Sequence, residues 1–265
     1  MAGAKGFFTD TTLCIGCKAC EVACKQWNQL PDDGLLFTGM SYDNTVHLGA
    51  STWRHVAFIE RPVPLSTQDA GAFSWLFSSD VCKHCVRAGC LESCPTGAII
   101  RTEFDSVYVQ PDICNGCGYC IVNCPFGVID RRSEDGRAWK CTLCYDRLRE
   151  DMTPACAKAC PTESIVFGDL DELRTRARVR VEKLQDAGMR EAYLYGEDAA
   201  SQPGTEGLNA FFLLLDKPEV YNLPPDPAIP TKGVGRSWIS MAAAAAGIAL
   251  MAVGSVFFSK LGGRS

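Results

Sequence analysis

Residues 114–125 read C-N-G-C-G-Y-C-I-V-N-C-P and hold four cysteines at the spacing C-x2-C-x2-C-x3-C-P. In this spacing three thiolates bind one 4Fe-4S cluster, and the fourth reaches across to a second cluster. A tight loop of this kind holds neighbouring thiols so that they converge on one place. We therefore expect metal-ligand bonds to replace much of the usual apolar core around it.

Outward from this run, the remaining cysteines fall into three further groups of four. In chain order the first group is Cys14, Cys17, Cys20 and Cys24, the second is Cys82, Cys85, Cys90 and Cys94, the third is Cys114, Cys117, Cys120 and Cys124, and the fourth is Cys141, Cys144, Cys156 and Cys160. None of the 16 cysteines is left over. Because a 4Fe-4S cluster takes four thiolates, the sequence predicts four 4Fe-4S clusters as cofactors.

Other uses of cysteine fit these spacings less well. Disulfides are typical of short secreted chains, and thiols within one tight loop cannot easily pair with distant partners. Zinc sites use two C-x2-C pairs or mixtures with histidine, so the fourth group alone could form one but the three-cysteine runs could not. Covalent haem needs a histidine directly after C-x2-C, which is absent, and His47, His55 and His84 do not form the pair beside two cysteines that a Rieske centre needs.

Composition narrows the class of protein further. The 265 residues allow one or two domains, and 47% of them are hydrophobic, which leaves material for an apolar core besides the clusters. A formal net charge of -5 argues against a nucleic-acid-binding surface. Cations near the cysteines would either raise cluster reduction potentials or remain solvated loop charges, and the sequence leaves both interpretations open. These cations are Lys18, Lys25, Lys83, Arg87, Lys140 and Lys158.

The carboxyl end contains a long apolar run. No charged residue occurs in 237–259, and as a helix this run would reach roughly 35 Å, enough to cross a hydrocarbon core of about 30 Å. We therefore expect one transmembrane helix at 236–260 rather than a buried core helix. Ser240, Gly247 and Gly254 recur every seven residues, so one face is made of small residues that allow close approach of another helix.

Charged residues do not fix the orientation of this helix. Lys232 and Arg236 precede it, and Lys260 and Arg264 follow it. The amino terminus, M-A-G-A-K-G-F-F-T-D, has neither an apolar run of signal-peptide length nor a twin arginine. We therefore expect any export to depend on the signal of a partner.

Short regular elements are expected between these features. The patterns predict strands at 96–100, 107–109, 126–130, 192–195 and 210–215, and a stiff extended linker at 223–230. A surface helix is expected at 169–188, ending at Gly188. Its apolar face would contain Leu170, Leu173, Ala177, Val181 and Leu184.

Residues 14–28, C-I-G-C-K-A-C-E-V-A-C-K-Q-W-N, resemble the iron-sulfur (beta) subunit of membrane-bound respiratory formate dehydrogenases of the molybdopterin oxidoreductase family. The likeness continues through the cysteine runs at 82–100, 114–130, 140–147 and 154–168 and through the terminal helix, so it covers nearly the whole chain. Related subunits of nitrate, polysulfide and dimethyl sulfoxide reductases and of some membrane hydrogenases share the cysteine frame. The motif K-A-C-E-V-A-C-K-Q-W-N and the single anchor helix favour formate dehydrogenase.

The resemblance implies an α+β fold with two ferredoxin-like two-cluster modules, one inserted in the other, followed by a C-terminal transmembrane helix. The implied domains are an outer module at 1–80 and 130–170, an inner module at 81–129, a region of helix, strands and linker at 171–235, and the membrane helix at 236–260. It also implies four ligand sets. Set A is Cys14, Cys17, Cys20 and Cys160; set B is Cys24, Cys141, Cys144 and Cys156; set C is Cys82, Cys85, Cys90 and Cys124; set D is Cys94, Cys114, Cys117 and Cys120.

The function implied by the resemblance is electron transfer. Electrons would pass from a molybdopterin catalytic subunit, with molybdenum or tungsten, through four clusters towards a membrane cytochrome b and quinone. The implied location is a bacterial inner membrane, with the cluster domain on the periplasmic side. We assign no catalytic residue to this chain. It contains no complete nucleotide-binding motif, and no residue pattern indicates a catalytic base, a catalytic nucleophile or a metal with an open position. Two alternatives are the same subunit in a hydrogenase or another molybdopterin oxidoreductase, and a zinc-stapled adaptor without redox activity.

Overall fold

The computed structural model describes residues 3–34, 37, 39, 42, 45, 47–61 and 74–262. The chain divides into two compact units, Met1–Ala228 and Ile229–Ser265. All 16 cysteines belong to the first unit, and none of them forms a disulfide. Arg264, one of the two basic residues that follow the apolar helix in the sequence, lies outside the described residues.

A mixed sheet forms the centre of the first unit. In spatial order its strands are β8 (Ile165–Asp169), β1 (Lys5–Asp10), β10 (Ala210–Leu214) and β9 (Tyr193–Tyr195). Strand β1 pairs in parallel with β10 and antiparallel with β8. Strands β9 and β10 confirm two of the predicted strands, whereas β1 and β8 were not predicted. The sheet therefore joins the amino-terminal strand to segments that follow the last cysteine.

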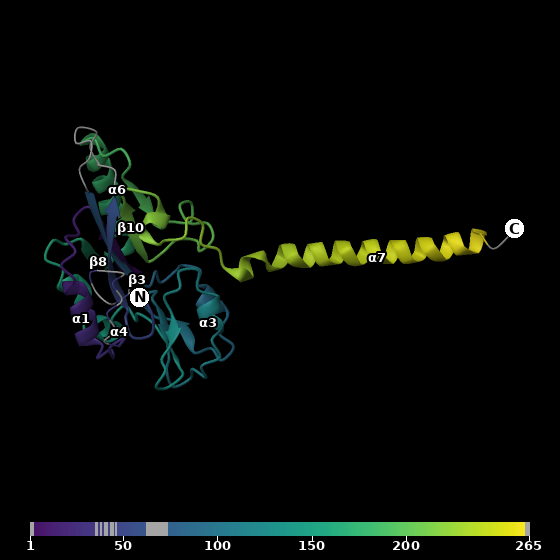
Figure 1. Ribbon diagram of the computed structural model, residues 1–265, viewed down its shortest axis with the longest axis horizontal. Coiled ribbons are helices and arrows are strands. Elements are labelled where there is room, and N and C mark those ends of the chain that lie inside the picture. The colour runs from purple at the N-terminus through teal and green to yellow at the C-terminus, as the bar shows by residue number, and fades with distance from the viewer. Residues whose placement is uncertain are drawn as a thin grey trace. The chain divides into compact units, whose positions relative to one another are not determined.

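Helix α6 (Leu170–Asp186) packs against β1, β8 and β9 of this sheet (Figure 1). It begins after Asp169, whose carboxylate accepts a hydrogen bond from the Asp171 N–H and so satisfies one of the free donors of the first turn. The helix and its apolar face confirm the prediction. Leu170, Leu173, Ala177 and Leu184 are buried, and Val181 packs against the same apolar core.

Three antiparallel strand pairs complete the strands among the described residues of this unit. They are β2 (Arg54–Arg61) with β3 (Ser74–Val81), β4 (Ile99–Arg101) with β5 (Val107–Val109), and β6 (Asp130–Arg131) with β7 (Ala138–Trp139). The predicted strand at 126–130 was wrong except for its last residue. Gly127, with φ +61, instead turns the chain so that its N–H bonds to the Cys124 carbonyl.

Short helices follow or contain many of the cysteines. These are α1 (Ala19–Trp27), α2 (Gly89–Glu92), α3 (Tyr119–Val122), α4 (Tyr145–Arg149) and α5 (Ala155–Lys158). Helix α1 contains Cys20 and Cys24, and α5, which packs against it, contains Cys156. The mixture of helices and strands agrees with the α+β class expected from the sequence.

The sequence predicts a stiff extended linker at 223–230, but the first residues of this segment pack against the compact unit. Leu223 is buried in the apolar core, and the Pro224 carbonyl accepts a hydrogen bond of 2.5 Å from the Tyr195 hydroxyl. The compact unit accordingly extends to Ala228. Short 3-10 helices, η1 (Pro218–Tyr221) and η2 (Pro230–Gly233), lie on either side of this segment in the chain.

The second unit contains α7 (Val234–Gly262), the helix predicted at the carboxyl end. By length and composition alone, the stretch Pro230–Gly254, which includes most of α7, could cross a membrane. It is the one such stretch among the described residues. Apolar side chains such as Ile239 and Leu250 are 72% and 73% exposed. An apolar surface of this kind needs a partner other than water.

Candidate metal centres

Strand pairing brings the two ends of the cysteine pattern together. In the antiparallel pair β1–β8, Thr9 lies opposite Ile165. Cys14 follows β1 and Cys160 precedes β8, so this register places their loops at the same edge of the sheet. Cys14, Cys17, Cys20 and Cys160 line one cavity. The thiols of set A therefore share a single cavity.

The residues around this cavity suit an iron-sulfur cluster. Among the described residues, no carboxylate or imidazole lines it, so the thiols are the metal-binding donors found there. Burial raises the pKa of the Cys14 thiol, and the neighbouring Cys160 and Cys17 raise it further. Within the part of the chain that the structure describes, no three His, Cys, Asp or Glu side chains surround a single metal ion. A 4Fe-4S cluster does not require that arrangement, because each of its four thiolates binds a different iron atom.

The thiols of set B gather around Cys24. Burial raises the pKa of this thiol well above its usual range, and the neighbouring thiols of Cys156, Cys141 and Cys144 raise it further. Two N–H groups point at these sulfurs. The Leu143 N–H lies 3.4 Å from the Cys141 sulfur, and the Asn28 amide lies 3.7 Å from the Cys24 sulfur. N–H groups directed at cluster ligands tune reduction potentials.

Sets C and D are arranged in the same way. Burial raises the pKa of Cys85 well above its usual range, with Cys82, Cys124 and Cys90 as the neighbouring thiols. Burial also raises the pKa of Cys120 to about 11, and its thiol neighbours are Cys114, Cys117 and Cys94. The Ala138 N–H donates to the Cys114 sulfur at 3.4 Å. Sets B, C and D therefore each have one thiol whose electrostatic neighbours are the other three members of its set.

Some thiols also have electrostatic neighbours in a different set. These neighbours connect each set to the next one. Cys156 of set B is a neighbour of Cys20 of set A, and Cys82 of set C is a neighbour of Cys141 of set B. Cys120 of set D is likewise a neighbour of Cys90 of set C. Neighbouring thiols thus link the four expected sets in the order A, B, C, D, and we call this order the row of sets.

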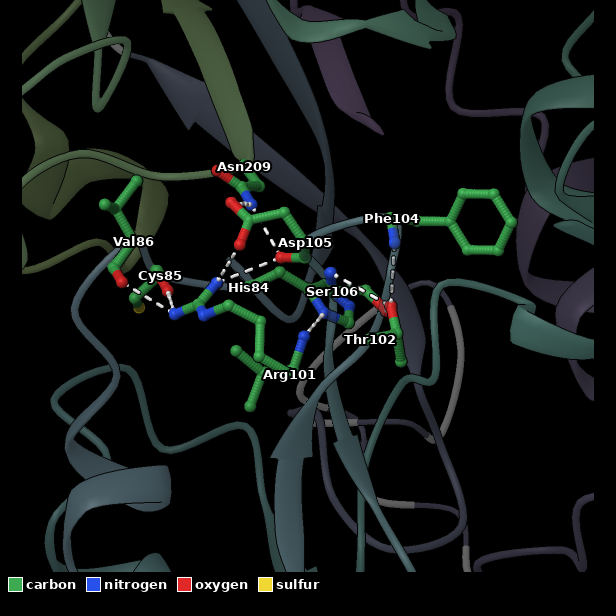
Figure 2. Close-up of polar contacts among 10 residues, drawn as sticks. His84, Cys85, Val86, Arg101, Thr102, Phe104, Asp105, Ser106 and Asn209 are labelled. Atoms are coloured by element: carbon green, nitrogen blue, oxygen red, sulfur yellow. Dashed lines mark hydrogen bonds and ion pairs between the residues drawn. The ribbon is translucent and has the colours of Figure 1, made fainter. Parts of the chain in front are cut away.

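A hydrogen-bond network holds the loop that presents Cys85 (Figure 2). The Arg101 guanidinium donates to the carbonyls of Cys85 and Val86, at 2.9 and 2.6 Å, and to Asp105 at 3.0 Å. The amide of Asn209, just before β10, donates to the same Asp105 carboxylate at 2.9 Å. The second cysteine group is therefore fixed both to the β4–β5 turn and to the central sheet.

Buried cations lie among the thiols, and the sequence found only some of them. Lys83 and Lys140 are 1% and 2% exposed, so these two of the six cations named from the sequence are buried. Lys18 and Lys25 instead pair with Glu21 and Asp33. Sequence reasoning missed Arg54, which is 1% exposed and donates to the Cys156 sulfur at 3.3 Å. No cysteine lies near Arg54 in the sequence, so no local pattern marked it.

We expect Gly116→Ala to loosen the third cysteine group. Gly116 lies between Cys114 and Cys117 with φ +71, and a Cβ there would be 2.3 Å from the Gly136 carbonyl oxygen. The left-handed conformation costs a non-glycine residue about 1–2 kcal/mol, and the contact adds to this cost by pushing the β6–β7 turn away. The variant should bind less iron and unfold at a lower temperature.

Gly97→Ala is the matched control for this substitution. Gly97 has nearly the same backbone, with φ +68, but an added Cβ would have nothing within 4 Å. Iron content and thermal unfolding of both variants separate the backbone cost from the steric cost. Equal losses in the two variants would contradict a role for the contact with Gly136.

Comparison with known protein families agrees with the cysteine pattern. Residues 13–98 and 73–170 each match a family described as a 4Fe-4S dicluster domain. Two such domains account for four 4Fe-4S clusters, as the 16 cysteines predicted.

Curated relatives are similar over most of the chain. It is 42% identical over 224 residues to the formate dehydrogenase iron-sulfur subunit of Haemophilus influenzae, covering 83% of this chain and 68% of the relative. It is also 42% identical over 226 residues to the nitrate-inducible formate dehydrogenase iron-sulfur subunit of Escherichia coli, covering 84% and 73%. The B subunit of the anaerobic dimethyl sulfoxide reductase of Escherichia coli is 33% identical over 171 residues, covering 64% and 76%. The chain therefore belongs to the family of formate dehydrogenase iron-sulfur subunits, which are non-catalytic electron-transfer subunits carrying 4Fe-4S clusters.

Proposed function

We propose that this chain carries electrons from a molybdopterin formate dehydrogenase subunit towards a membrane cytochrome b and quinone. The observation that carries the proposal is the row of four thiol sets, in which each set has thiol neighbours in the next. Relatives at 42% identity are formate dehydrogenase iron-sulfur subunits, which supports formate as the source of the electrons. A 4Fe-4S cluster supplies a one-electron couple without an open site for substrate.

Sets A to D are the proposed ligand sets. The shared cavity supports set A, and the thiol neighbours of Cys24, Cys85 and Cys120 support sets B, C and D. With these sets, the inner module at 81–129 is inserted in an outer module at 1–80 and 130–170. The β1–β8 pairing supports this nesting, because it joins the two parts of the outer module.

The two ends of the row are the proposed contact sites for partners. Cys17 of set A and Cys117 of set D are the exposed cysteines of the chain. Apolar side chains are exposed close by in the sequence, including Ile15 at 59% and Val122 at 79%. Solvent-exposed apolar groups around a redox centre favour docking of another protein. We propose that the catalytic subunit binds at one end and the membrane subunit at the other.

Helix α7 is the proposed single-pass anchor in a bacterial inner membrane, with the clusters on the periplasmic side. Its length and apolar composition support the anchor, and the resemblance to respiratory formate dehydrogenases supports the location. A second candidate function is the same role in another molybdopterin oxidoreductase. The 33% identity to the B subunit of dimethyl sulfoxide reductase favours this alternative over a hydrogenase, but it covers less of the chain.

Purification of the intact complex through a tag on this chain tests the proposed function. We expect about sixteen iron atoms per copy of the chain, since four clusters contain four irons each. A pterin subunit with molybdenum or tungsten should copurify, and the complex should reduce an artificial dye with formate. Iron near eight per chain, or stoichiometric zinc, would contradict the four-cluster function. Dye reduction with hydrogen, or oxidation of a reduced dye by dimethyl sulfoxide, in a complex that does not reduce the dye with formate would select an alternative complex.

A further inference from the structure

A chain of hydrogen bonds joins a thiol of set A to a thiol of set B. The Arg54 guanidinium donates through Nη2 to the Cys156 sulfur at 3.3 Å, and through Nη1 to the Ser79 carbonyl and hydroxyl at 3.1 and 3.3 Å. The Ser79 hydroxyl lies 3.3 Å from the Cys20 sulfur. Arg54 and Ser79 are diagonal neighbours on the β2–β3 pair, because Arg54 lies opposite Val81.

The direction of these hydrogen bonds follows from the chemistry of the groups. A ligating cysteine is a thiolate and has no proton to donate. The Ser79 hydroxyl must therefore donate to Cys20 when that thiolate binds iron, and its oxygen accepts from Arg54. One guanidinium thus reaches Cys156 directly and Cys20 through a single hydroxyl.

Arg54 is a deeply buried cation that has no carboxylate partner among the described residues. Its exposed fraction is 1%, as is that of Ser79, and no ion pair joins it to an Asp or Glu among the described residues. The nearby buried Lys83, by contrast, pairs with Asp80. An unpaired buried cation is strongly unfavourable. The anionic sulfurs on either side are therefore the groups that stabilise its charge.

The protonation of Arg54 agrees with this arrangement. Burial alone would lower the pKa of the guanidinium, but Cys156, Cys20 and Cys141 outweigh it and raise the pKa above its usual value. The Phe7 ring packs against the guanidinium, with 4.8 Å between the Arg54 Cζ and the ring centroid. The cation is therefore held in a fixed place between two thiol sets, screened from water.

We propose that Arg54 and Ser79 form a cationic bridge that raises the reduction potentials of the clusters held by sets A and B, with the larger effect at set B. This inference rests on the proposed ligand sets. Each reduction adds one electron and thus one negative charge, which a nearby buried cation stabilises. The effect is larger at set B because the guanidinium touches the Cys156 sulfur, whereas the Ser79 hydroxyl separates it from Cys20.

The test measures cluster potentials in the intact complex. The experiment titrates four proteins with dithionite and redox mediators: wild type, Arg54→Met, Arg54→Lys and Ser79→Ala. Electron paramagnetic resonance follows the reduction of each cluster. Arg149→Met is the control, because it removes an exposed arginine from α4, the helix that directly follows Cys144. Iron content of every variant shows whether all four clusters remain.

Arg54→Met should lower the equilibrium constant for reduction of the set B cluster at least tenfold, which is about 59 mV for a one-electron couple. The set A cluster should shift in the same direction by less, and those of sets C and D should not shift. Arg54→Lys keeps the charge and should recover at least half of the set B shift. Ser79→Ala breaks only the link to Cys20, so it should lower the potential of the set A cluster alone. Arg149→Met should shift neither, because bulk water screens an exposed charge.

Two results would overturn the bridge: unchanged set A and B potentials in Arg54→Met, or an unchanged set A potential in Ser79→Ala. If Arg54→Met fails to assemble its clusters, Arg54→Lys and Ser79→Ala still decide the question, because both retain the buried charge. Absence of four clusters in wild type would count against the proposed function instead. The two failures are therefore distinguishable.

Discussion

Cys160→Ser should remove the same cluster as Cys14→Ser and leave the other three in place. The β1–β8 register brings the loops of these two residues together, and both line the set A cavity. A serine hydroxyl is a much poorer iron ligand than a thiolate, so a cubane that loses one ligand becomes unstable. We expect each variant to lose up to about four iron atoms per chain. Electron paramagnetic resonance of the reduced complex would show one missing signal, identical in the two variants.

Cys141→Ser is the matched control for this experiment. Cys141 belongs to the same sequence group as Cys160, yet its thiol neighbours are Cys144 and Cys156, together with Cys82. It should therefore remove the set B signal and leave the set A signal intact. If Cys160→Ser instead removes the signal lost in Cys141→Ser, the cysteines are grouped by sequence rather than across the outer module, and sets A and B are wrong.

The sequence predicted those elements whose pattern is local. Helix α6 was found because its apolar residues recur at helical spacing, and β5, β9 and β10 were found because they are short apolar runs. The β2–β3 pair was not predicted. Arg54, Ser78 and Ser79 are buried there, and such buried polar side chains remove the alternation by which a strand is recognised.

The same distinction between local and distant information applies to the candidate site. All 16 cysteines could be named from spacing, because a cluster loop places several thiolates within a few residues. Their division into sets depended on resemblance, since the β1–β8 pairing that joins Cys14 to Cys160 leaves no trace in either local stretch. Arg54 was not predicted to lie beside the cysteines for the same reason. Its sulfur neighbour Cys156 is 102 positions away along the chain.

Deletion of residues 237–265 should release the complex of this chain with its catalytic subunit from the membrane and leave all four clusters in place. Helix α7 is the described helix that is apolar and long enough to span a bilayer, and no cysteine follows Cys160. The truncated complex should move from the membrane to the soluble fraction on ultracentrifugation. Its iron content and formate-dependent dye reduction should stay at wild-type levels, while formate-dependent quinone reduction is lost.

Gly247→Leu combined with Gly254→Leu is the matched variant that keeps the anchor. In this chain an added Cβ at either glycine would meet nothing within 4 Å, so the helix itself should tolerate the change. Leucine makes α7 more apolar, and the variant should stay in the membrane fraction. If the small face packs against a helix of the membrane subunit, the larger side chains block close approach, and quinone reduction should fall while dye reduction survives. Full quinone reduction in this variant would mean that α7 is only a tether, and a truncated complex that remains in the membrane would mean that α7 is not the anchor.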